Sequence, residues 1–254
     1  MNQKDAGTII VTGGAGFIGS NFILDWIGAT GGRVINLDKL TYAGNLRNLE
    51  SVSGDRRHQF VQGDIADGEL VRQLLKQHQP WAVINFAAET HVDRSIANPL
   101  PFIETNIFGT FVLLEAARKS DKLFFHVSTD EVYGDAVGRD SFTENDVLHP
   151  SNPYSATKAS ADLLVEAFQR TYGMKCITSR CTNNFGPYQF PEKLIPKTII
   201  LALKNEKIPI YGDGNQQRSW IYVLDHVDAI ETLLKKGKPG QVYNVTAWKE
   251  VSNI

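Results

Sequence analysis

The sequence has little cysteine and almost no excess charge. Its 254 residues include two cysteines, Cys176 and Cys181, and the net charge is −2. Five residues apart on an expected strand, the two side chains point to opposite faces, so no disulfide between them is expected. Few cysteines, and an N-terminal segment without an apolar stretch of signal-peptide length, favour the reducing cytoplasm. The nearly balanced charge gives no electrostatic basis for binding nucleic acid or an anionic membrane surface.

Long apolar runs and clusters of metal ligands are also lacking. No continuous apolar run approaches the roughly 18 residues that cross a bilayer, so no membrane association is expected. The six histidines are scattered rather than grouped at the spacing of metal ligands, and we expect no metal site. With 42% hydrophobic residues, the chain has ample material for a large buried core.

Short unbroken apolar runs alternate with helix-like segments. Continuous apolar strands separated by helices are typical of a parallel sheet that is covered on both faces. The predicted fold class is therefore α/β, a Rossmann-type doubly wound parallel sheet. The expected strands are 8–12, 33–37, 58–61, 82–88, 122–128 and 176–180, and the expected helices are 17–29, 67–78, 100–119 and 154–172.

The pattern changes after residue 182. Turn chemistry at 183–187 and 212–215, and shorter elements that include a helix near 225–236, replace the regular alternation. We predict a first domain over 1–182 and a smaller C-terminal lobe over 183–254. The elements of this lobe are expected to interleave with the first domain rather than to follow a clean linker.

A glycine-rich turn follows the first expected strand. Gly13, Gly16 and Gly19 open a helix, where glycines permit a tight turn, close approach to a pyrophosphate and close packing of helix on strand. The second strand ends at Asp38, nineteen residues beyond Gly19. An acid at this place suits the ribose hydroxyls of NAD and repels the 2′-phosphate of NADP. The domain 1–182 is therefore predicted to bind NAD.

Residues 126–135, HVSTDEVYGD, end an apolar strand with a hydroxyl and two carboxylates. Buried carboxylates are costly unless they are paired or used in chemistry. Thr129, Asp130 and Glu131 therefore form either a solvated turn after the strand or part of a catalytic site, and this stretch alone leaves both interpretations open.

Tyr154 and Lys158 stand four residues apart at the start of an expected helix, so they share one helix face. A free phenol has a pKa of about 10, and a base that works near neutrality must lose about three units, roughly 4 kcal/mol. A neighbouring ammonium and a positive nicotinamide ring favour the phenolate. We therefore predict a catalytic tyrosine and lysine, against the alternative of a packed tyrosine and a solvated lysine.

Together these motifs resemble the extended short-chain dehydrogenase/reductase family. One branch is resembled over nearly the whole chain, the dTDP-glucose 4,6-dehydratases. The stretches that carry this resemblance are AAETHVDRSI (87–96), ETN (104–106), NPYSATKA (152–159), NNFGPYQFPEKLIP (183–196) and IPIYGDGNQQRSW (208–220), beside the Thr-Asp-Glu of 129–131.

The resemblance implies a reaction and a role for each catalytic residue. Such enzymes oxidise the sugar at C4, remove water across C5–C6 and return the hydride to C6, so that NAD is regenerated. By resemblance, Glu131 is the base at C5, Asp130 is the acid that assists loss of the C6 hydroxyl, and Thr129 hydrogen-bonds the sugar beside Tyr154. Both acids can turn into one cleft only if the strand ends within Thr-Asp-Glu.

The resemblance also assigns binding residues. Asp64 and Ile65, after the third expected strand, are placed to reach the adenine, although a plain turn explains them equally well. The NAD contacts implied are Phe17, Ile18, Asp38, Lys39, Leu40, Thr41, Asp64, Ile65, Phe86, Ala87, Ala88, Glu89, Thr105, Tyr154, Lys158 and Asn184. The nucleotide-sugar contacts implied are Thr90, Thr129, Asn183, Lys193, Leu194, Pro209, Ile210, Tyr211, Arg218 and Asn253.

The sequence departs from the family pattern in three places. Ser219 stands where the family usually has an acid, and Thr246-Ala247 replaces a glycine pair. Family members also continue past the position of Ile254, so the C-terminal lobe is expected to be truncated relative to the family. The chain is then a fragment, a compact relative or a protein with a weakened site.

Other functions stay open at this stage. A 4,6-dehydratase acting on a UDP- or CDP-sugar fits the same motifs. A nucleotide-sugar 4-epimerase shares the C4 oxidation but needs no elimination pair, and a non-catalytic NAD-binding relative needs no catalytic residues. By analogy with related proteins, a homodimer is expected through the stretches 100–119 and 154–172.

Overall fold

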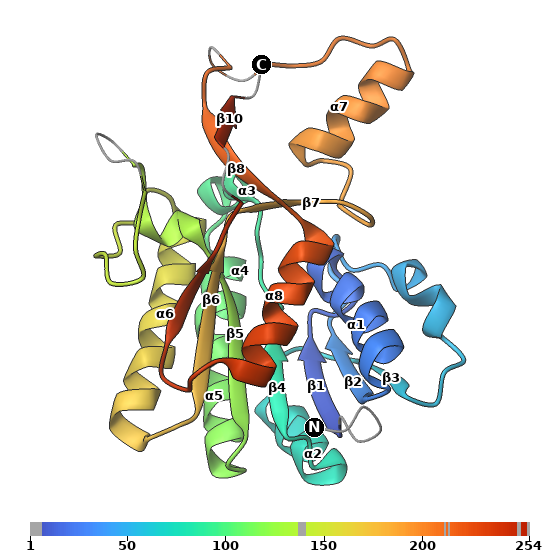
Figure 1. The fold of residues 1–254 in the computed structure, drawn as a ribbon, viewed down its shortest axis with the longest axis vertical. Helices are drawn as coiled ribbons and strands as arrows, with labels where there is room; N and C mark the ends of the chain where they lie inside the picture. The colour runs from blue at the N-terminus through green and yellow to red at the C-terminus, as the bar shows by residue number, and fades with distance from the viewer. Residues whose placement is uncertain (1–6, 137–140, 211, 213, 248–249, 253–254) are drawn as a thin grey trace.

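The computed structural model describes residues 7–136, 141–210, 212, 214–247 and 250–252. Its centre is a seven-stranded parallel sheet with the strand order β3-β2-β1-β4-β5-β6-β9 (Figure 1). The sheet forms because its inner strands are short apolar runs that are buried on both faces. The strands are β1 (Thr8–Thr12), β2 (Arg33–Asp38), β3 (His58–Gln62), β4 (Ala82–Asn85), β5 (Leu123–Thr129), β6 (Cys176–Cys181) and β9 (Val242–Val245).

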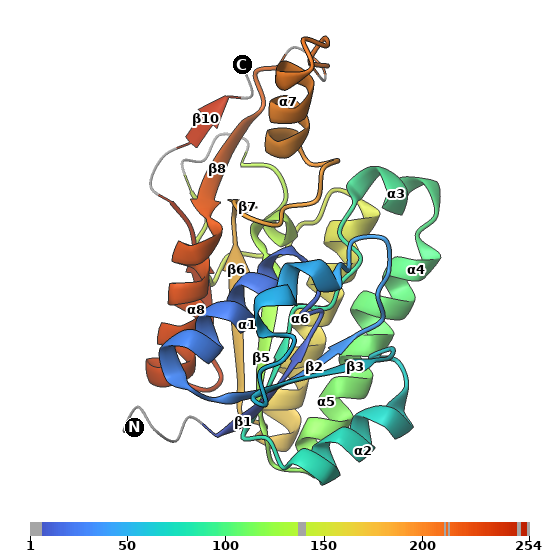
Figure 2. The same ribbon diagram turned by 90° about the vertical axis from the view of Figure 1, so that its right-hand side faces the viewer.

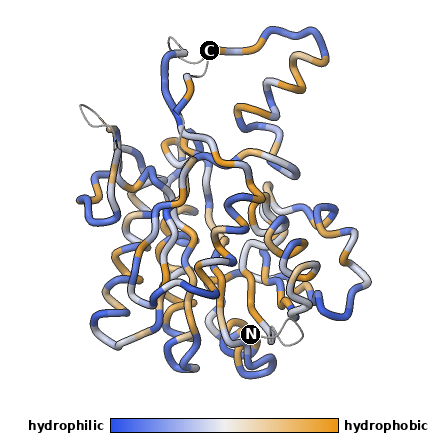
Figure 3. Tube along the Cα trace, in the orientation of Figure 1, coloured by the Kyte–Doolittle hydropathy of each residue, from blue (hydrophilic) through white to orange (hydrophobic). Residues whose placement is uncertain are grey.

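Helices cover both faces of this sheet (Figure 2). On one face α1 (Phe17–Thr30) and α8 (Val223–Lys236) pack around Phe22, Trp26 and Ile230. On the other face α2 (Gly68–His78), α5 (Thr110–Lys119) and α6 (Pro153–Tyr172) bury Leu74 and Phe168. The hydropathy of the chain follows this layering, with hydrophobic residues concentrated along the central strands (Figure 3). The predicted Rossmann-type fold is confirmed.

Two predicted elements differ in extent from the observed ones. The expected strand 82–88 ends at Asn85, because the next residues leave the ladder to line the cavity described below. The expected helix 100–119 is not uniform: α4 (Leu100–Phe102) is followed by a π-helical stretch, η2 (Ile103–Gly109), and then by α5. In η2 the Asn106 amide accepts from the Glu89 backbone N–H at 2.9 Å and donates to the Glu89 carbonyl oxygen at 3.0 Å. The irregular turn thus ties this helix to the loop after β4.

The helical stretch Leu100–Lys119 also meets a length and hydropathy criterion for crossing a membrane, with half of the tested window buried inside the protein. Core helices of globular proteins pass the same test, so the observation has little weight. The expectation rests on continuous apolar runs, and polar residues such as Asn106 interrupt the run in this helix. The mean hydropathy of the helix nevertheless stays above the level of the criterion, so this result differs from the expectation.

A smaller three-stranded sheet extends the fold beyond the carboxyl end of β6. Its strand order is β10-β8-β7, with β7 (Asn183–Phe185), β8 (Gln217–Tyr222) and β10 (Glu250–Ser252). Beside it stands α7 (Leu194–Leu203), which contributes no residue to the buried core. The chain returns from β8 through α8 to β9, which pairs with β6 in the large sheet. The division at residues 182 and 183 stays a prediction.

Shorter segments connect these elements and carry part of the site. They are the 3-10 turns η1 (Leu46–Val52) and η3 (Asp130–Tyr133) and the helix α3 (Val92–Ala97). The strand β5 ends at Thr129 and η3 starts at the next residue. The expectation that the strand ends within Thr-Asp-Glu is therefore confirmed.

Candidate active site

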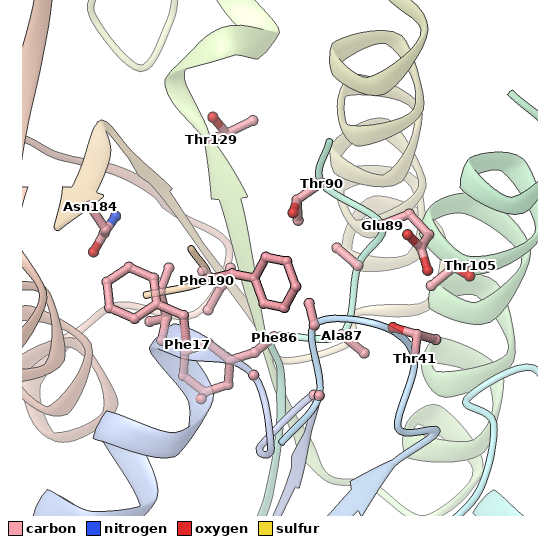
Figure 4. A pocket seen from close by; sticks show the side chains of 18 of the residues that line it. Phe17, Thr41, Phe86, Ala87, Glu89, Thr90, Thr105, Thr129, Asn184 and Phe190 are labelled. Atoms are coloured by element: carbon pink, nitrogen blue, oxygen red, sulfur yellow. The ribbon is translucent and has the colours of Figure 1, made fainter. Parts of the chain in front are cut away.

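A cavity of about 430 Å³ lies at the carboxyl ends of the parallel strands, between the large sheet and the smaller lobe. Figure 4 shows side chains from several elements around it, among them Phe17, Phe86, Thr129, Asn184 and Phe190. This edge is where ligands bind in open α/β sheets, because the strand ends and the helix N-termini converge there. The position of the cavity therefore agrees with the predicted dinucleotide site.

The glycine-rich turn forms the floor of the cavity beside β1. Gly13 has a φ of +70°, and a Cβ atom there would lie 2.6 Å from the backbone nitrogen of Ala87. A Cβ on Gly19 would collide with the carbonyl oxygen of Gly13. The backbone can thus pass closely between β1, α1 and the end of β4 only without these side chains. Gly16 lines the cavity at the N-terminus of α1, where backbone N–H groups favour a phosphate.

Asp38 closes β2 at the wall of the same cavity. One carboxylate oxygen accepts from the Ala15 backbone N–H at 2.9 Å, and the other accepts from the Leu40 N–H at 2.8 Å. Burial raises the pKa of Asp38 while these two bonds oppose the rise. Each oxygen keeps a second lone pair, so the fixed carboxylate can still accept from a ribose diol. Lys39, which also lines the cavity, pairs with Asp64 at 2.6 Å.

The two acids of the η3 turn lie directly after β5. The Thr129 hydroxyl donates to Asp130 at 3.2 Å and accepts from the Glu131 N–H at 3.3 Å, which fixes the turn. Burial, followed by the charge of Glu131, raises the pKa of Asp130 to about 6. Burial also raises the pKa of Glu131, opposed by a hydrogen bond from Asn152. Both acids therefore hold a proton more readily than exposed carboxyls do.

Tyr154 and Lys158 face this turn from the first two turns of α6. Asn152 caps the helix through a capping box with Ser155, so the start of α6 is firmly placed. The Lys158 ammonium donates to the Val127 carbonyl oxygen at 2.8 Å. Burial raises the pKa of Tyr154 well above its usual value. The lowering expected from an ammonium together with a positive nicotinamide ring is thus not produced by the protein's own groups, among which burial has the largest effect.

Three segments meet over the cavity in contacts that the sequence did not predict. The guanidinium of Arg94 lies 3.7 Å from the ring centroid of Tyr42 and 3.1 Å from a carboxylate oxygen of Glu192. The rings of Tyr42 and Phe190 are nearly perpendicular, with their centroids 5.3 Å apart. Arg94, Phe190 and Glu192 lie inside stretches quoted for the family resemblance, which was the one signal for them. Tyr42, Phe190 and Glu192 line the cavity.

Most of the predicted site residues come together around this cavity. Those that line it are Gly13, Gly16, Phe17, Ile18, Gly19, Asp38, Lys39, Thr41, Asp64, Ile65, Phe86, Ala87, Ala88, Glu89, Thr90, Thr105, Thr129, Glu131, Tyr154, Lys158, Asn183, Asn184, Lys193 and Leu194.

The remaining site predictions fall outside this lining. Leu40 and Asp130 are not among the lining residues, although the Leu40 N–H holds Asp38 and the Asp130 carboxylate accepts from the Thr129 hydroxyl. Pro209, Ile210 and Arg218 are exposed on the smaller lobe, where the charge of Arg218 still lowers the pKa of Asp130 and Glu131 against the effect of burial. Tyr211 and Asn253 lie outside the described residues. The individual roles of all these residues stay predictions.

The two substitutions relative to the family pattern contact each other. The Ser219 hydroxyl lies 3.0 Å from the hydroxyl of Thr246 and donates to the Ala247 carbonyl oxygen at 3.0 Å. These bonds join β8 to the segment after β9.

Comparison with known proteins places this fold and site in a family. Residues 10–254 match the family described as GDP-mannose 4,6 dehydratase. A dTDP-glucose 4,6-dehydratase of Xanthomonas campestris pv. campestris is 54% identical over 257 residues, which cover 97% of this chain and 73% of that protein.

Two solved structures agree closely with this one, and both are dTDP-glucose 4,6-dehydratases with NAD bound. The protein from Bacillus anthracis is 44% identical, with a TM-score of 0.92 over 98% of this chain and 78% of that one. The protein from Streptomyces venezuelae is 44% identical, with a TM-score of 0.93 over 97% and 77%. The chain therefore belongs to the family of nucleotide-sugar 4,6-dehydratases described by that model, together with the dTDP-glucose 4,6-dehydratases that it matches.

Proposed function

We propose that the chain is an NAD-dependent dTDP-glucose 4,6-dehydratase, a hydro-lyase that forms the 4-keto-6-deoxy sugar. The observation that carries this proposal is the η3 turn, where two carboxyls with raised pKa follow β5. The charges of both act on Tyr154, and Glu131 lines the same cavity as Tyr154 and Lys158. An oxidoreductase that only moves hydrogen at C4 has no use for such a pair. The relatives with this activity match nearly the whole chain.

The residues around the cavity fit NAD. The turn from Gly13 to Gly19 leaves room for a pyrophosphate beside the N-terminus of α1, and Asp38 is held in place to accept from a ribose diol. When bound, NAD would supply the redox chemistry, since it takes up the hydrogen of C4 and returns it at C6. The 2′-phosphate of NADP would meet the Asp38 carboxylate.

Removal of the C4 hydroxyl proton is assigned to Tyr154. The phenolate is costly in this buried site, where burial and the charge of Glu131 raise the pKa of Tyr154. The Lys158 ammonium shares the same helix face and favours the phenolate by its charge. The hydroxyl of Thr129, at the end of β5, lines the cavity and hydrogen-bonds Tyr154, and it can reach the sugar when its O–H turns from Asp130 toward the cavity.

Elimination of water is assigned to the acids of η3. Once C4 is a ketone, the C5 proton is acidic, and the Glu131 carboxylate takes it. The electron pair of the C5–H bond forms the C5–C6 double bond as the C6–O bond breaks. Asp130, with a pKa of about 6, gives its proton to the departing hydroxyl, which leaves as water. Glu131 gains a proton and Asp130 loses one, so after this step Glu131 is neutral and Asp130 is charged.

The nucleotide is proposed from the relatives. Lys193 lines the cavity and Arg218 lies near enough for its charge to act on both acids. These cations suit a diphosphate, which every nucleotide sugar carries, so they do not select dTDP over UDP or CDP. Competition binding with dTDP and UDP would measure that preference directly.

We also propose that the protein is cytoplasmic and acts as a homodimer. Both cysteines are free and buried, which suits a reducing compartment. Large apolar side chains of η2, α5 and α6 are exposed, among them Phe108, Phe111 and Leu163. A second copy of the chain would cover them.

The test is incubation of the purified, NAD-loaded chain with dTDP-glucose. The proposal predicts a 4-keto-6-deoxy product, detected by its absorbance in alkali and by mass. A C4-inverted sugar without loss of water would favour a 4-epimerase instead. Glu131→Gln is the matched control, since it keeps the shape of the site and should lose most of the product.

A further inference from the structure

A buried carboxylate lies below the catalytic lysine and has no role in the chemistry derived above. Asp162 follows Lys158 by four residues on α6, so it lies on the helix face that also carries Tyr154. Asp162 is 5% exposed and Lys158 is 4% exposed. A buried charge is costly unless it is paired. The residues that contact Asp162 therefore indicate why a carboxylate is buried here.

Residues of two neighbouring strands hold Asp162, and one of them is linked to a third strand. Its Oδ2 accepts from Arg180 Nε on β6 at 2.8 Å, and its Oδ1 faces His126 Nε2 on β5 at 3.5 Å. The other ring nitrogen of His126 lies 3.4 Å from the amide nitrogen of Asn85 on β4. Because Asn85 already accepts from Thr12 through its amide oxygen at 2.7 Å, its NH₂ group donates to His126. The proton of the neutral imidazole then lies on Nε2, toward Asp162.

The network continues on the other side through Arg180. The Arg180 Nη1 donates to the Tyr133 hydroxyl at 2.8 Å, and that hydroxyl donates to Asn244 Oδ1 on β9 at 2.7 Å. Polar contacts thus cross the sheet from β1 through β4, β5 and β6 to β9, below the cavity. At the centre of this network, the Asp162 carboxylate pairs directly with the buried Arg180 guanidinium and lies one helical turn after the buried Lys158 on α6, near enough for its charge to act on the ammonium.

We propose that Asp162 and Arg180 are a positioning pair for the catalytic lysine. Asp162 holds Lys158 in its ammonium form, and Arg180 limits how strongly it does so. The catalytic role of Lys158 in this inference rests on the proposed function, whereas the pairing of Asp162 with Arg180 rests on their contact in the structure. Burial lowers the pKa of Lys158, and the charge of Asp162 opposes that lowering. Without the negative charge of Asp162, the buried Lys158 ammonium would lose the charge that opposes its desolvation, and Lys158 would release its proton at lower pH.

Other groups around Lys158 do not supply this effect. Burial keeps the Cys181 thiol protonated, with a pKa of about 12, and lowers the pKa of His126, which is neutral. Within the part of the chain that the structure describes, the groups whose charges act between themselves and Lys158 are Asp162 on α6, His126 on β5 and Cys181 on β6. Tyr154 and Glu131 line the same cavity as Lys158, and Arg180 pairs with Asp162.

The test compares two substitutions that break the same network but remove opposite charges. In NAD-loaded protein labelled at lysine, the side-chain NMR signal of Lys158, assigned with Lys158→Met, reports its titration. Asp162→Asn should lower the titration midpoint by about one pH unit or more, and Arg180→Gln should raise it. The double variant should return the midpoint close to that of the parent. The alkaline limb of the C4 oxidation rate should move in the same directions.

A merely structural role predicts a different result. Both single variants would then lose stability, measured by urea unfolding, without moving the midpoint or while moving it in the same direction, and either outcome would overturn the proposal. If Asp162→Asn fails to fold, the upward shift in Arg180→Gln decides. If the two variants shift the Lys158 titration midpoint in opposite directions but the parent does not turn over dTDP-glucose, the proposed function is wrong and the positioning pair is still supported.

Discussion

Asp38 is the residue on which the choice of cofactor depends. Its carboxylate is fixed by the N–H groups of Ala15 and Leu40 and lines the cavity. We expect NAD to bind at least about tenfold more tightly than NADP, roughly 1.4 kcal/mol, because a 2′-phosphate would meet this charge. Asp38→Asn should bring the affinities for NAD and NADP closer together. Fluorescence titration of both cofactors measures it, and equal affinities in the parent would show that Asp38 does not face the ribose.

Asp130 should lower the stability of the folded protein at neutral pH. Its pKa rises from 3.8 to about 6 on folding, so the native state binds this proton more tightly than the unfolded chain does. The stabilisation is fully present below about pH 3.8 and is lost as the pH rises through about 6, and it amounts to about 3 kcal/mol. Asp130→Asn should therefore be more stable than the parent at about pH 7 and gain little at about pH 4. Urea unfolding at both values checks this, and a variant that is less stable at neutral pH would contradict it.

At the scale of single residues, motifs predicted the site residues at strand ends and helix starts better than the contacts between loops over the cavity. Gly13, Asp38 and Tyr154 were found because each occupies a fixed place after a strand or at a helix start. The contact of Arg94 with Tyr42 and Glu192 joins segments far apart in the chain. No periodicity or spacing encodes such a meeting of three loops, so it becomes visible only in the folded molecule.

Among the elements, strongly apolar strands and helices were predicted to within a few residues. The exceptions lie at the site. The strand predicted over 82–88 ends at Asn85 because Phe86 to Glu89 line the cavity instead of extending the ladder. The helix predicted over 100–119 contains the π-helical η2, where Asn106 bonds the loop after β4. A hydropathy pattern does not distinguish these irregular turns from regular ones.

The helix α7 should open more easily than α6. It is rich in isoleucine and leucine, yet the structure buries none of its residues, whereas α6 buries nine, including Tyr154 and Val165. Local opening costs little where few apolar contacts are lost. Native-state hydrogen exchange should therefore show faster exchange along α7 than along α6. Equal protection of the two helices would mean that another surface covers α7 in solution.

For the whole molecule, the alternation of strands and helices predicted the class of fold but not the path of the chain. The return of β9 to the large sheet beside β6, after the excursion through β7 and β8, has no local signal. The same holds for the contact between Ser219 and Thr246. Each is set by which strands lie next to each other, and strand neighbours far apart in sequence are chosen by the packing of the whole core.

The expected homodimer can be tested on the exposed apolar side chains of η2, α5 and α6. Phe108 is 51% exposed, Phe111 is 39% exposed and Leu163 is 56% exposed. A charged residue at the centre of an apolar interface typically costs several kcal/mol, so Leu163→Glu should shift the protein toward monomer. Sedimentation of parent and variant measures the mass. Leu203→Glu, on the 81% exposed side chain of α7, is the control, and equal masses for parent and Leu163→Glu would contradict this interface.

The central claim is that the acids of η3 carry out the elimination, and stopped-flow absorbance at the NADH band tests it most directly. Glu131→Gln removes the base at C5 and Asp130→Asn removes the proton donor at C6, while Tyr154 and Lys158 remain. Losing one general acid or base costs about 10²–10⁴-fold, roughly 3–5 kcal/mol. With dTDP-glucose, both variants should accumulate enzyme-bound NADH and release the 6-deoxy product that much more slowly than the parent. Turnover at the parent rate without accumulation of NADH would show that these carboxyls are not catalytic.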